Sequence, residues 1–313
     1  MHRKAYWRLK KNAVRCFAES NRRMDKMTIE EIKKVCVAGG GLMGRQIALN
    51  TAIHGYDVAL TDNSKEVCQA VKTWAAEYLA GRVAKGKMTE QAAKEAGSRF
   101  YVSESLEEAA NSAQLVIEVI IEVQQIKFDF FKKLNGIVAK DVILASNSST
   151  MPSSMFKDYV DNPSRLANLH YFNPALVMKL VEVVQGDHTS EETAQALMEF
   201  SRKTGKTPIH ITKECEGFVV NRAFGALKKE CLRIVEEGIC TPQEVDLGLE
   251  LGLNYPMGVF RLNDLTGIDL YFHMLEQWFK ESGEKPAGYD MYKSMVEKGE
   301  LGRKTGKGFY EYT

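Results

Sequence analysis

The stretch VCVAGGGLMG, residues 35–44, decides the fold of this chain. A short apolar run predicts a buried strand, and a glycine-rich turn follows it at once. Gly39, Gly41 and Gly44 have the spacing G-x-G-x-x-G, and a helical pattern over residues 45–54 comes next. Strand, glycine turn and helix in this order are typical of the first unit of a doubly wound α/β domain.

This turn also predicts a phosphate site. The first glycine of such a turn permits the tight bend, the second lets the backbone approach a pyrophosphate, and the third lets helix and strand pack closely. The free N–H groups at the start of the helix offer hydrogen bonds to phosphate oxygens. We therefore expect a dinucleotide to bind at Gly39, Gly41, Leu42, Met43 and Gly44.

An acidic residue stands at the end of the second predicted strand, residues 57–60. Asp62 lies 18 residues beyond Gly44, where a carboxylate can accept hydrogen bonds from a ribose diol and would repel a 2′-phosphate. This favours NAD over NADP. The same sequence is compatible with Asp62 as the N-cap of a helix that begins near Ser64.

Strands and helices continue to alternate as far as residue 212, which predicts a doubly wound Rossmann-type domain with right-handed crossovers. The later predicted strands are residues 115–121, 142–145, 167–172, 179–184 and 208–212, and the predicted helices are a pair over 64–97, then 122–134 and 191–204.

The pattern changes after Lys213, where helical patterns cover residues 217–237, 241–251 and 264–280. We expect a basic extension over residues 1–27, an NAD-binding domain over 28–214 and an all-helical domain over 215–313. Exposed apolar faces on the helical domain predict a homodimer.

An ionisable pair is set into two neighbouring apolar strands. His170 lies in a run that ends at Asn173-Pro174, and Glu182 lies in the next run. Proline cannot donate to a sheet ladder, so it marks a strand end where side chains can face a cleft. The pair could be a general base with its orienting carboxylate, or a structural histidine satisfied by a nearby glutamate.

Other polar residues follow the ends of predicted strands. Ser149 belongs to a hydroxyl-rich run, residues 146–150, at the edge where ligands of open α/β sheets bind; the run is also a good helix N-cap. Lys85 and Lys87 flank the turn of the first helix pair. They could meet a phosphorylated substrate or simply be solvated surface.

The amino-acid composition argues against several classes of protein. The net charge is +1, whereas a nucleic-acid binder needs a clear basic excess. Six cysteines have no metal-ligand spacing, so we expect reduced thiols and no metal site. No apolar run approaches the length of a membrane helix. Residues 1–27 hold nine Lys and Arg; we expect a dispensable extension of a cytoplasmic protein, or else a presequence for the mitochondrial matrix.

Seven segments together resemble one family. They are GGGLMGRQIA, VIEVIIEVQQIKFDFFKKL, ASNSSTMPSS, LHYFNPALVMKLVEVV, GFVVNR, YPMGVFRLNDLTGID and GRKTGKGFYEY. Because these segments occur in this order, the chain closely resembles the 3-hydroxyacyl-CoA dehydrogenases, most of all the bacterial 3-hydroxybutyryl-CoA dehydrogenases. The resemblance covers residues 33–312 and implies NAD-dependent interconversion of 3-hydroxyacyl-CoA and 3-oxoacyl-CoA.

The resemblance also implies roles for single residues. His170 matches the catalytic base and Glu182 its partner. Ser149 and Asn221 match residues that hold the substrate near the reacting carbon, and Asn173 completes the site; Ser149 and Asn173 would also face the cofactor. It places Glu122 and Lys127 on the nicotinamide-ribose side of the cofactor. It places Lys85 and Lys87 near the CoA phosphates. Val123 departs from the pattern, which has Asn after the glutamate.

Two other functions are compatible with the same motifs. One is an NAD-dependent dehydrogenase of a free hydroxy or sugar acid, as in the gulonate-type branch that the chain also resembles. The other is a non-catalytic, crystallin-like NAD-binding protein.

Overall fold

The computed structural model describes residues 32–312, so the basic extension predicted for residues 1–27 lies outside the described part. The chain divides into two compact units. The first ends at Val219 and the second begins at Val220, whereas the sequence places the domain boundary between residues 214 and 215.

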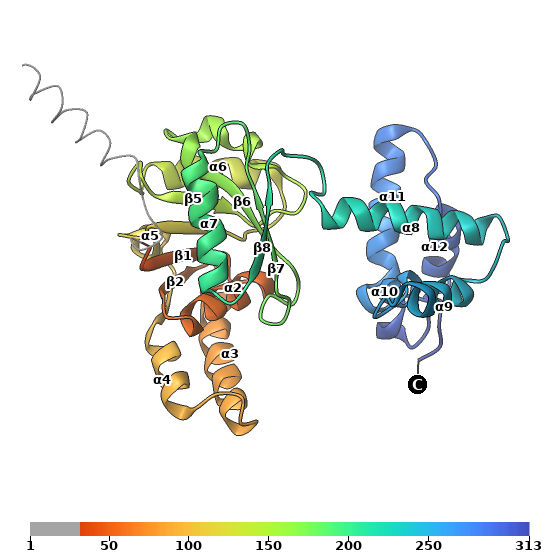
Figure 1. Ribbon diagram of the computed structural model, residues 1–313, viewed down its shortest axis with the longest axis horizontal. Helices are drawn as coiled ribbons and strands as arrows, with labels where there is room; N and C mark the ends of the chain where they lie inside the picture. Colours follow the sequence, from red (N-terminus) through yellow and green to blue (C-terminus); the bar gives the residue numbers. More distant parts are fainter. Residues whose placement is uncertain (1–31, 313) are drawn as a thin grey trace, which may run out of the picture. The chain divides into compact units, whose positions relative to one another are not determined.

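Within residues 32–312, eight strands form one sheet in the order β3-β2-β1-β4-β5-β6-β7-β8 (Figure 1). Neighbouring strands are parallel except β6 and β7, which are antiparallel. The strands are β1 (Lys34–Ala38), β2 (Asp57–Thr61), β3 (Phe100–Ser103), β4 (Leu115–Glu118), β5 (Ile143–Ser146), β6 (Leu166–Tyr171), β7 (Leu180–Val184) and β8 (Thr207–Ile211). The predicted doubly wound α/β fold is confirmed.

Helices cover both faces of this sheet. Those of the first unit are α2 (Leu42–Ile53), α3 (Lys65–Ala84), α4 (Glu90–Ser98), α5 (Leu106–Ala110), α6 (Gln124–Asn135) and α7 (Glu191–Lys203), with short 3-10 turns at η2 (Ser153–Met155), η3 (Lys157–Tyr159) and η4 (Pro163–Arg165). The helices α3 and α4 form a hairpin that projects away from the sheet (Figure 1).

Alternate side chains of β1 enter two different cores. Val35 and Val37 pack in one core with apolar residues of α2 and α7. Cys36 packs on the opposite face with residues of α5 and α6. Burial on both faces explains why the parallel strands read as continuous apolar runs instead of alternating ones.

The strand order reverses at β1, because β2 lies on one side of it and β4 on the other. At such a switch point the loops after the strands diverge and leave a crevice beyond the carboxyl ends. The glycine turn, Asp62 and the loop after β4 all lie at this edge.

The first unit differs from the sequence-based expectation in three ways. The strand predicted over residues 115–121 ends at Glu118, whose carboxylate accepts a hydrogen bond from the Ile120 N–H and so bends the chain away from the ladder. The short elements β3 and α5 are not predicted at all. The predicted N-cap at residues 146–150 is wrong, because no α-helix begins there.

The second unit is helical, as predicted. It contains α8 (Val220–Glu236), α9 (Pro242–Leu253), α10 (Val259–Thr266), α11 (Ile268–Ser282), α12 (Tyr289–Glu297) and the turn η5 (Arg303–Thr305). None of the helices in residues 32–312 is long and apolar enough to cross a membrane.

Backbone conformation explains where the predicted helices of this unit are wrong. The helix predicted from residue 217 begins at Val220, because Gly217 and Phe218 have positive φ angles of 70° and 50°. The single helix predicted over residues 264–280 is two helices, α10 and α11, divided at Gly267, which has φ 112°. Helix α12 is not predicted.

Candidate active site

A cavity of about 880 Å³ lies at the carboxyl edge of the sheet in the first unit, within the size range of ligand sites. Its walls come from the β1–α2 turn, the end of β2, and the loops after β4 and β5. The predicted cofactor residues that line it are Gly39, Gly41, Leu42, Met43, Asp62, Glu122 and Lys127.

The glycine turn has the geometry that a pyrophosphate requires. A Cβ at Gly39 would lie 2.4 Å from the Val119 carbonyl oxygen, and one at Gly44 would lie 1.9 Å from the Gly39 carbonyl oxygen. A Cβ at Gly41 would meet nothing within 4 Å, so space is open beside it. Helix α2 begins at Leu42 without a side-chain cap. These uncapped N–H groups and the open space at Gly41 fit a dinucleotide pyrophosphate.

Asp62 lies at the β2 end of the cavity. Its Oδ2 accepts a hydrogen bond from the Gly40 N–H at 2.7 Å, and its Oδ1 accepts one from the Ser64 N–H at 2.9 Å. Ser64, not Asp62, is the N-cap of α3, so the alternative assignment is wrong. A carboxylate has about four lone-pair sites. Asp62 therefore retains acceptor capacity for the hydroxyls of a ribose.

His170 and Glu182 are cross-strand partners in the antiparallel ladder of β6 and β7. The His170 Nδ1 lies 2.7 Å from the Glu182 Oε2, and the two residues are 6% and 0% exposed. Because a carboxylate only accepts, the Nδ1–H of the ring donates, and Nε2 is the nitrogen that can take up a proton. This is the arrangement of a general base held by an orienting carboxylate.

Two aromatic rings and one backbone N–H surround the pair. Phe172 and Phe218 lie with ring centroids 4.7 Å and 5.7 Å from that of His170. The second carboxylate oxygen of Glu182, Oε1, accepts a hydrogen bond from the Val219 N–H at 3.1 Å. Low dielectric strengthens the charge-assisted bond between imidazole and carboxylate.

Asn147 connects the histidine strand to the cavity. It lines the cavity at the end of β5, and its Oδ1 accepts a hydrogen bond from the Tyr171 N–H at 2.8 Å. This bond holds the end of β6 one residue beyond His170. Asn147 belongs to the run of residues 146–150 that the sequence places at the ligand-binding edge, but its own side chain is not singled out there.

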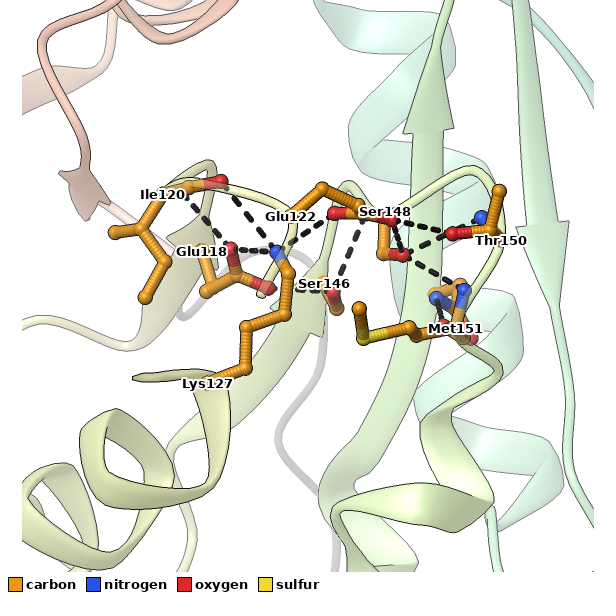
Figure 2. Close-up of polar contacts among 9 residues, drawn as sticks. Glu118, Ile120, Glu122, Lys127, Ser146, Ser148, Thr150 and Met151 are labelled. Atoms are coloured by element: carbon orange, nitrogen blue, oxygen red, sulfur yellow. Dashed lines mark hydrogen bonds and ion pairs between the residues drawn. The ribbon is translucent and has the colours of Figure 1, made fainter. Parts of the chain in front are cut away.

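Glu122 binds two hydroxyls of the loop after β5 (Figure 2). Its carboxylate accepts hydrogen bonds from Ser148 Oγ and from Thr150 Oγ1, the latter at 2.8 Å, and it lies 3.1 Å from Lys127 Nζ. Burial raises the pKa of Glu122, but the bonds from Ser148 and Thr150 and the charge of Lys127 outweigh burial, so that its pKa is lowered. Glu122 is therefore ionised at neutral pH.

Lys127 also pairs with a carboxylate that the sequence does not single out. Its Nζ lies 2.5 Å from the Glu118 Oε1, and both side chains are 1% exposed. The other oxygen of Glu118 accepts a hydrogen bond from Ser146 Oγ at 2.6 Å. An acidic residue in an otherwise apolar strand is the signal that could have identified Glu118.

The remaining predicted residues are not brought to the cavity wall. Ser149 is partly exposed, and its hydroxyl makes no hydrogen bond within residues 32–312; Asn173 is exposed and precedes a cis peptide bond to Pro174. Lys85 and Lys87 are exposed at the turn between α3 and α4, at the tip of the projecting hairpin (Figure 1). Asn221 lies in the first turn of α8, in the second unit. Their roles stay predictions.

Two family descriptions match nearly the whole described chain. "3-hydroxyacyl-CoA dehydrogenase, NAD binding domain" matches residues 34–215, and "3-hydroxyacyl-CoA dehydrogenase, C-terminal domain" matches residues 217–312. The first match covers the unit that contains the glycine turn and the cavity. The prediction of NAD as the cofactor is thereby confirmed.

Individual proteins agree with these matches. A probable 3-hydroxybutyryl-CoA dehydrogenase of Bacillus subtilis is 38% identical over 90% of this chain and 98% of its own length. A human mitochondrial hydroxyacyl-coenzyme A dehydrogenase is 35% identical over 90% of this chain and 91% of its own length. The crystal structure of (S)-3-hydroxybutyryl-CoA dehydrogenase from Ralstonia eutropha has a TM-score of 0.81 at 34% identity, covering 90% of this chain and 99% of that one. The chain belongs to the 3-hydroxyacyl-CoA dehydrogenase family.

Proposed function

We propose that this protein interconverts (3S)-3-hydroxyacyl-CoA and 3-oxoacyl-CoA with NAD(H), with short acyl chains as substrates. The observation that carries the proposal is the buried pair of His170 on β6 and Glu182 on β7, beside β5, whose following loop lines the dinucleotide cavity. The short-chain preference is supported by relatives named as 3-hydroxybutyryl-CoA dehydrogenases.

The orientation of the dinucleotide follows from the sheet order. Asp62, at the end of β2, would hold the adenosine ribose. The nicotinamide half would then lie beyond β4 and β5, beside Glu122 and Ser148 and toward β6. Bound NAD⁺ supplies the acceptor for the hydride that leaves C3 of the substrate.

The protein's own part in the reaction is to move a proton. In the oxidation, the Nε2 of His170 takes the proton of the C3 hydroxyl, and Glu182 stabilises the imidazolium through the other nitrogen. In the reduction, the imidazolium returns this proton to the C3 oxygen. Imidazole suits both directions because histidine changes charge near neutral pH.

Substrate positioning is assigned to residues that the resemblance implies. Ser149 and Asn221 would hydrogen-bond the C3 oxygen, and Asn173 would orient the C3 oxygen or the thioester carbonyl. Lys85 and Lys87 would attract the CoA phosphates as exposed cations. These assignments are supported by motif position.

Replacement of His170 tests the function directly. His170→Gln should lower kcat for the reduction of acetoacetyl-CoA by NADH about 10²–10⁴-fold, the usual contribution of a general base. The binding of NADH should stay close to that of the wild type, because His170 does not line the cavity. Turnover is measured from the loss of NADH absorbance, and binding from NADH fluorescence.

A comparison of two substrates with the wild-type enzyme tests the substrate class. The wild-type enzyme should reduce acetoacetyl-CoA much faster than free acetoacetate. Equal rates with the free acid would favour a hydroxy-acid dehydrogenase, and no turnover with either would favour a non-catalytic NAD-binding protein. Unchanged turnover in His170→Gln would contradict its role as the base.

We also propose that the protein is a homodimer through the second unit. On α11, Leu270, Met274 and Trp278 recur every four residues and are exposed, as are Leu247 and Leu251 on α9. Residues at this spacing form one stripe along a helix. Apolar stripes of this kind fit contact with a second copy. A cytoplasmic location stays a prediction, because the human relative is named mitochondrial.

A further inference from the structure

Three charged side chains form a compact group at the carboxyl edge of the sheet. The ammonium of Lys127 lies 2.5 Å from one carboxylate oxygen of Glu118 and 3.1 Å from one of Glu122. Two carboxylates and one ammonium give this group, here called the carboxylate–lysine cluster, a net charge of −1. Figure 2 shows the ammonium between the two carboxylates.

Glu118 accepts hydrogen bonds from several donors. Its Oε1 accepts from Lys127 and from the Ile120 N–H at 2.8 Å, and its Oε2 accepts from Ser146 Oγ at 2.6 Å. Each of these groups donates, and an ionised carboxylate is the form that accepts at both oxygens. Burial limits the screening of this carboxylate by salt.

The cluster lies on the nicotinamide side of the switch point. Glu122 and Lys127 line the cavity at the end of β4, whereas Asp62 lines it at the end of β2. A dinucleotide held by Asp62 at its adenosine ribose therefore places its other half beside the cluster. Glu118 is fully buried behind Lys127 and does not line the cavity.

The two redox forms of the cofactor differ in charge at this end. The nicotinamide ring carries a positive charge in NAD⁺ and none in NADH. A net negative cluster attracts the first and has little effect on the second, and the attraction is stronger in a partly buried site than in water. Without Glu118, the pair of Lys127 and Glu122 would be neutral and would lose this preference.

We propose that Glu118 is a residue that sets the redox preference of the site: its charge, acting from behind Lys127, favours binding of NAD⁺ relative to NADH. The inference rests on the proposed function, because that assigns the nicotinamide half to this end of the cavity. Glu118 touches neither cofactor nor substrate in this arrangement, and it acts through the charge balance of the cluster.

The test is the ratio of two dissociation constants. Glu118→Gln keeps the size of the side chain and removes its charge. The ratio of the Kd for NAD⁺ to the Kd for NADH should rise about tenfold, the size expected of one unit charge acting through a partly screened protein medium. Binding of NAD⁺ is measured by calorimetry and binding of NADH by fluorescence, without any substrate.

Three further variants separate charge from structure. Ser146→Ala removes a hydrogen bond to Glu118 without changing the charge, so the ratio should stay at the wild-type value. Glu118→Asp keeps the charge and should also keep the ratio near the wild-type value. Glu122→Gln removes one negative charge from a side chain that is 40% exposed, so it should fold even if Glu118→Gln does not, and it should raise the ratio.

The outcomes distinguish this inference from the proposed function. A raised ratio in Glu118→Gln, with the ratio unchanged in Glu118→Asp and Ser146→Ala, supports the role of Glu118. A ratio that stays constant in Glu118→Gln, or in Glu122→Gln where the former does not fold, overturns it while leaving the function intact. If the wild type binds neither NAD⁺ nor NADH, the proposed function fails, and the inference fails with it.

Discussion

At the scale of single residues, Glu122 connects the end of β4 to the loop after β5. Three donors, from Ser148, Thr150 and Lys127, converge on its carboxylate and lower its pKa from the ordinary value of 4.5. A group whose pKa is depressed by folding contributes stability above its unfolded pKa, and this contribution is lost as pH falls through the folded pKa.

We therefore expect a pH-dependent cost for Glu122→Gln. The variant should be less stable than the wild type between pH 6 and 8 by an amount that does not change with pH. The difference should shrink as pH falls from about 4.5, where the carboxylate of the unfolded chain becomes protonated, through the lower pKa of the folded state. Urea unfolding of both proteins across this range measures it. A difference that stays constant down to low pH would show that the lost interaction does not depend on the charge of Glu122.

The sequence singles out some residues of the candidate site and not others, for a physical reason. The glycines, Asp62, His170 and Glu182 stand at strand ends or in short motifs, where local spacing carries the information. Asn147 acts on Tyr171, which comes from a different strand, and Glu118 acts on Ser146, 28 residues away. Such pairs become neighbours only when the sheet is assembled, so residue spacing alone does not reveal them.

At the scale of elements, helix α6 begins without a capping side chain. Val123 is its N-cap residue, with φ −123° and ψ 117°, and makes no side-chain cap hydrogen bond. Asparagine at an N-cap accepts a hydrogen bond from the N–H two or three residues on, and valine has no atom that can do so. Helix α6 carries Lys127, so its first turn is part of the site.

Val123→Asn should stabilise the protein by about 1 kcal/mol, the usual worth of an N-cap. The backbone already has the extended conformation that such a cap needs. The free energy of unfolding in urea measures the gain. Val123→Ala is the matched control: it lacks the side-chain oxygen and should give no gain, and equal effects of the two substitutions would rule out capping as the cause.

Most elements that the sequence did not predict are short or divided by one residue; the exception, α12, has nine residues and begins without a side-chain cap. Strand β3 has four residues and α5 has five, too few for a periodic pattern to stand out. The break between α10 and α11 rests on Gly267 alone, and an isolated glycine in a helical pattern is often tolerated. Longer elements with a clear cap, such as α9 after Thr241, were predicted within two residues.

At the scale of the whole molecule, the apolar stripe of α11 gives a test of assembly. Met274→Glu should convert a dimer into a monomer, because a carboxylate in an apolar interface would lose its hydration without a partner. Met274 is 54% exposed in the single chain, so the substitution should leave the fold of one subunit intact. Analytical ultracentrifugation measures the mass of the assembly.

Lys280→Glu is the control for this substitution. It adds a negative charge on another face of the same helix, away from the stripe, and the dimer should persist. A wild type that sediments as a monomer would contradict the proposed dimer, and a dimer that survives Met274→Glu would place its interface elsewhere.

The antiparallel pairing of β6 and β7 has a consequence for how this enzyme can change. His170 and Glu182 face each other inside the ladder. Backbone hydrogen bonds of the sheet therefore set the distance between them, and the loop that connects the two strands does not set it. Because β6 also pairs with β5 and β7 with β8, we expect insertions and deletions in that connection, which carries Asn173 and the exposed Val177, to leave the strand register unchanged. The His170–Glu182 pair can therefore stay as it is while the sequence and length of the neighbouring loop change.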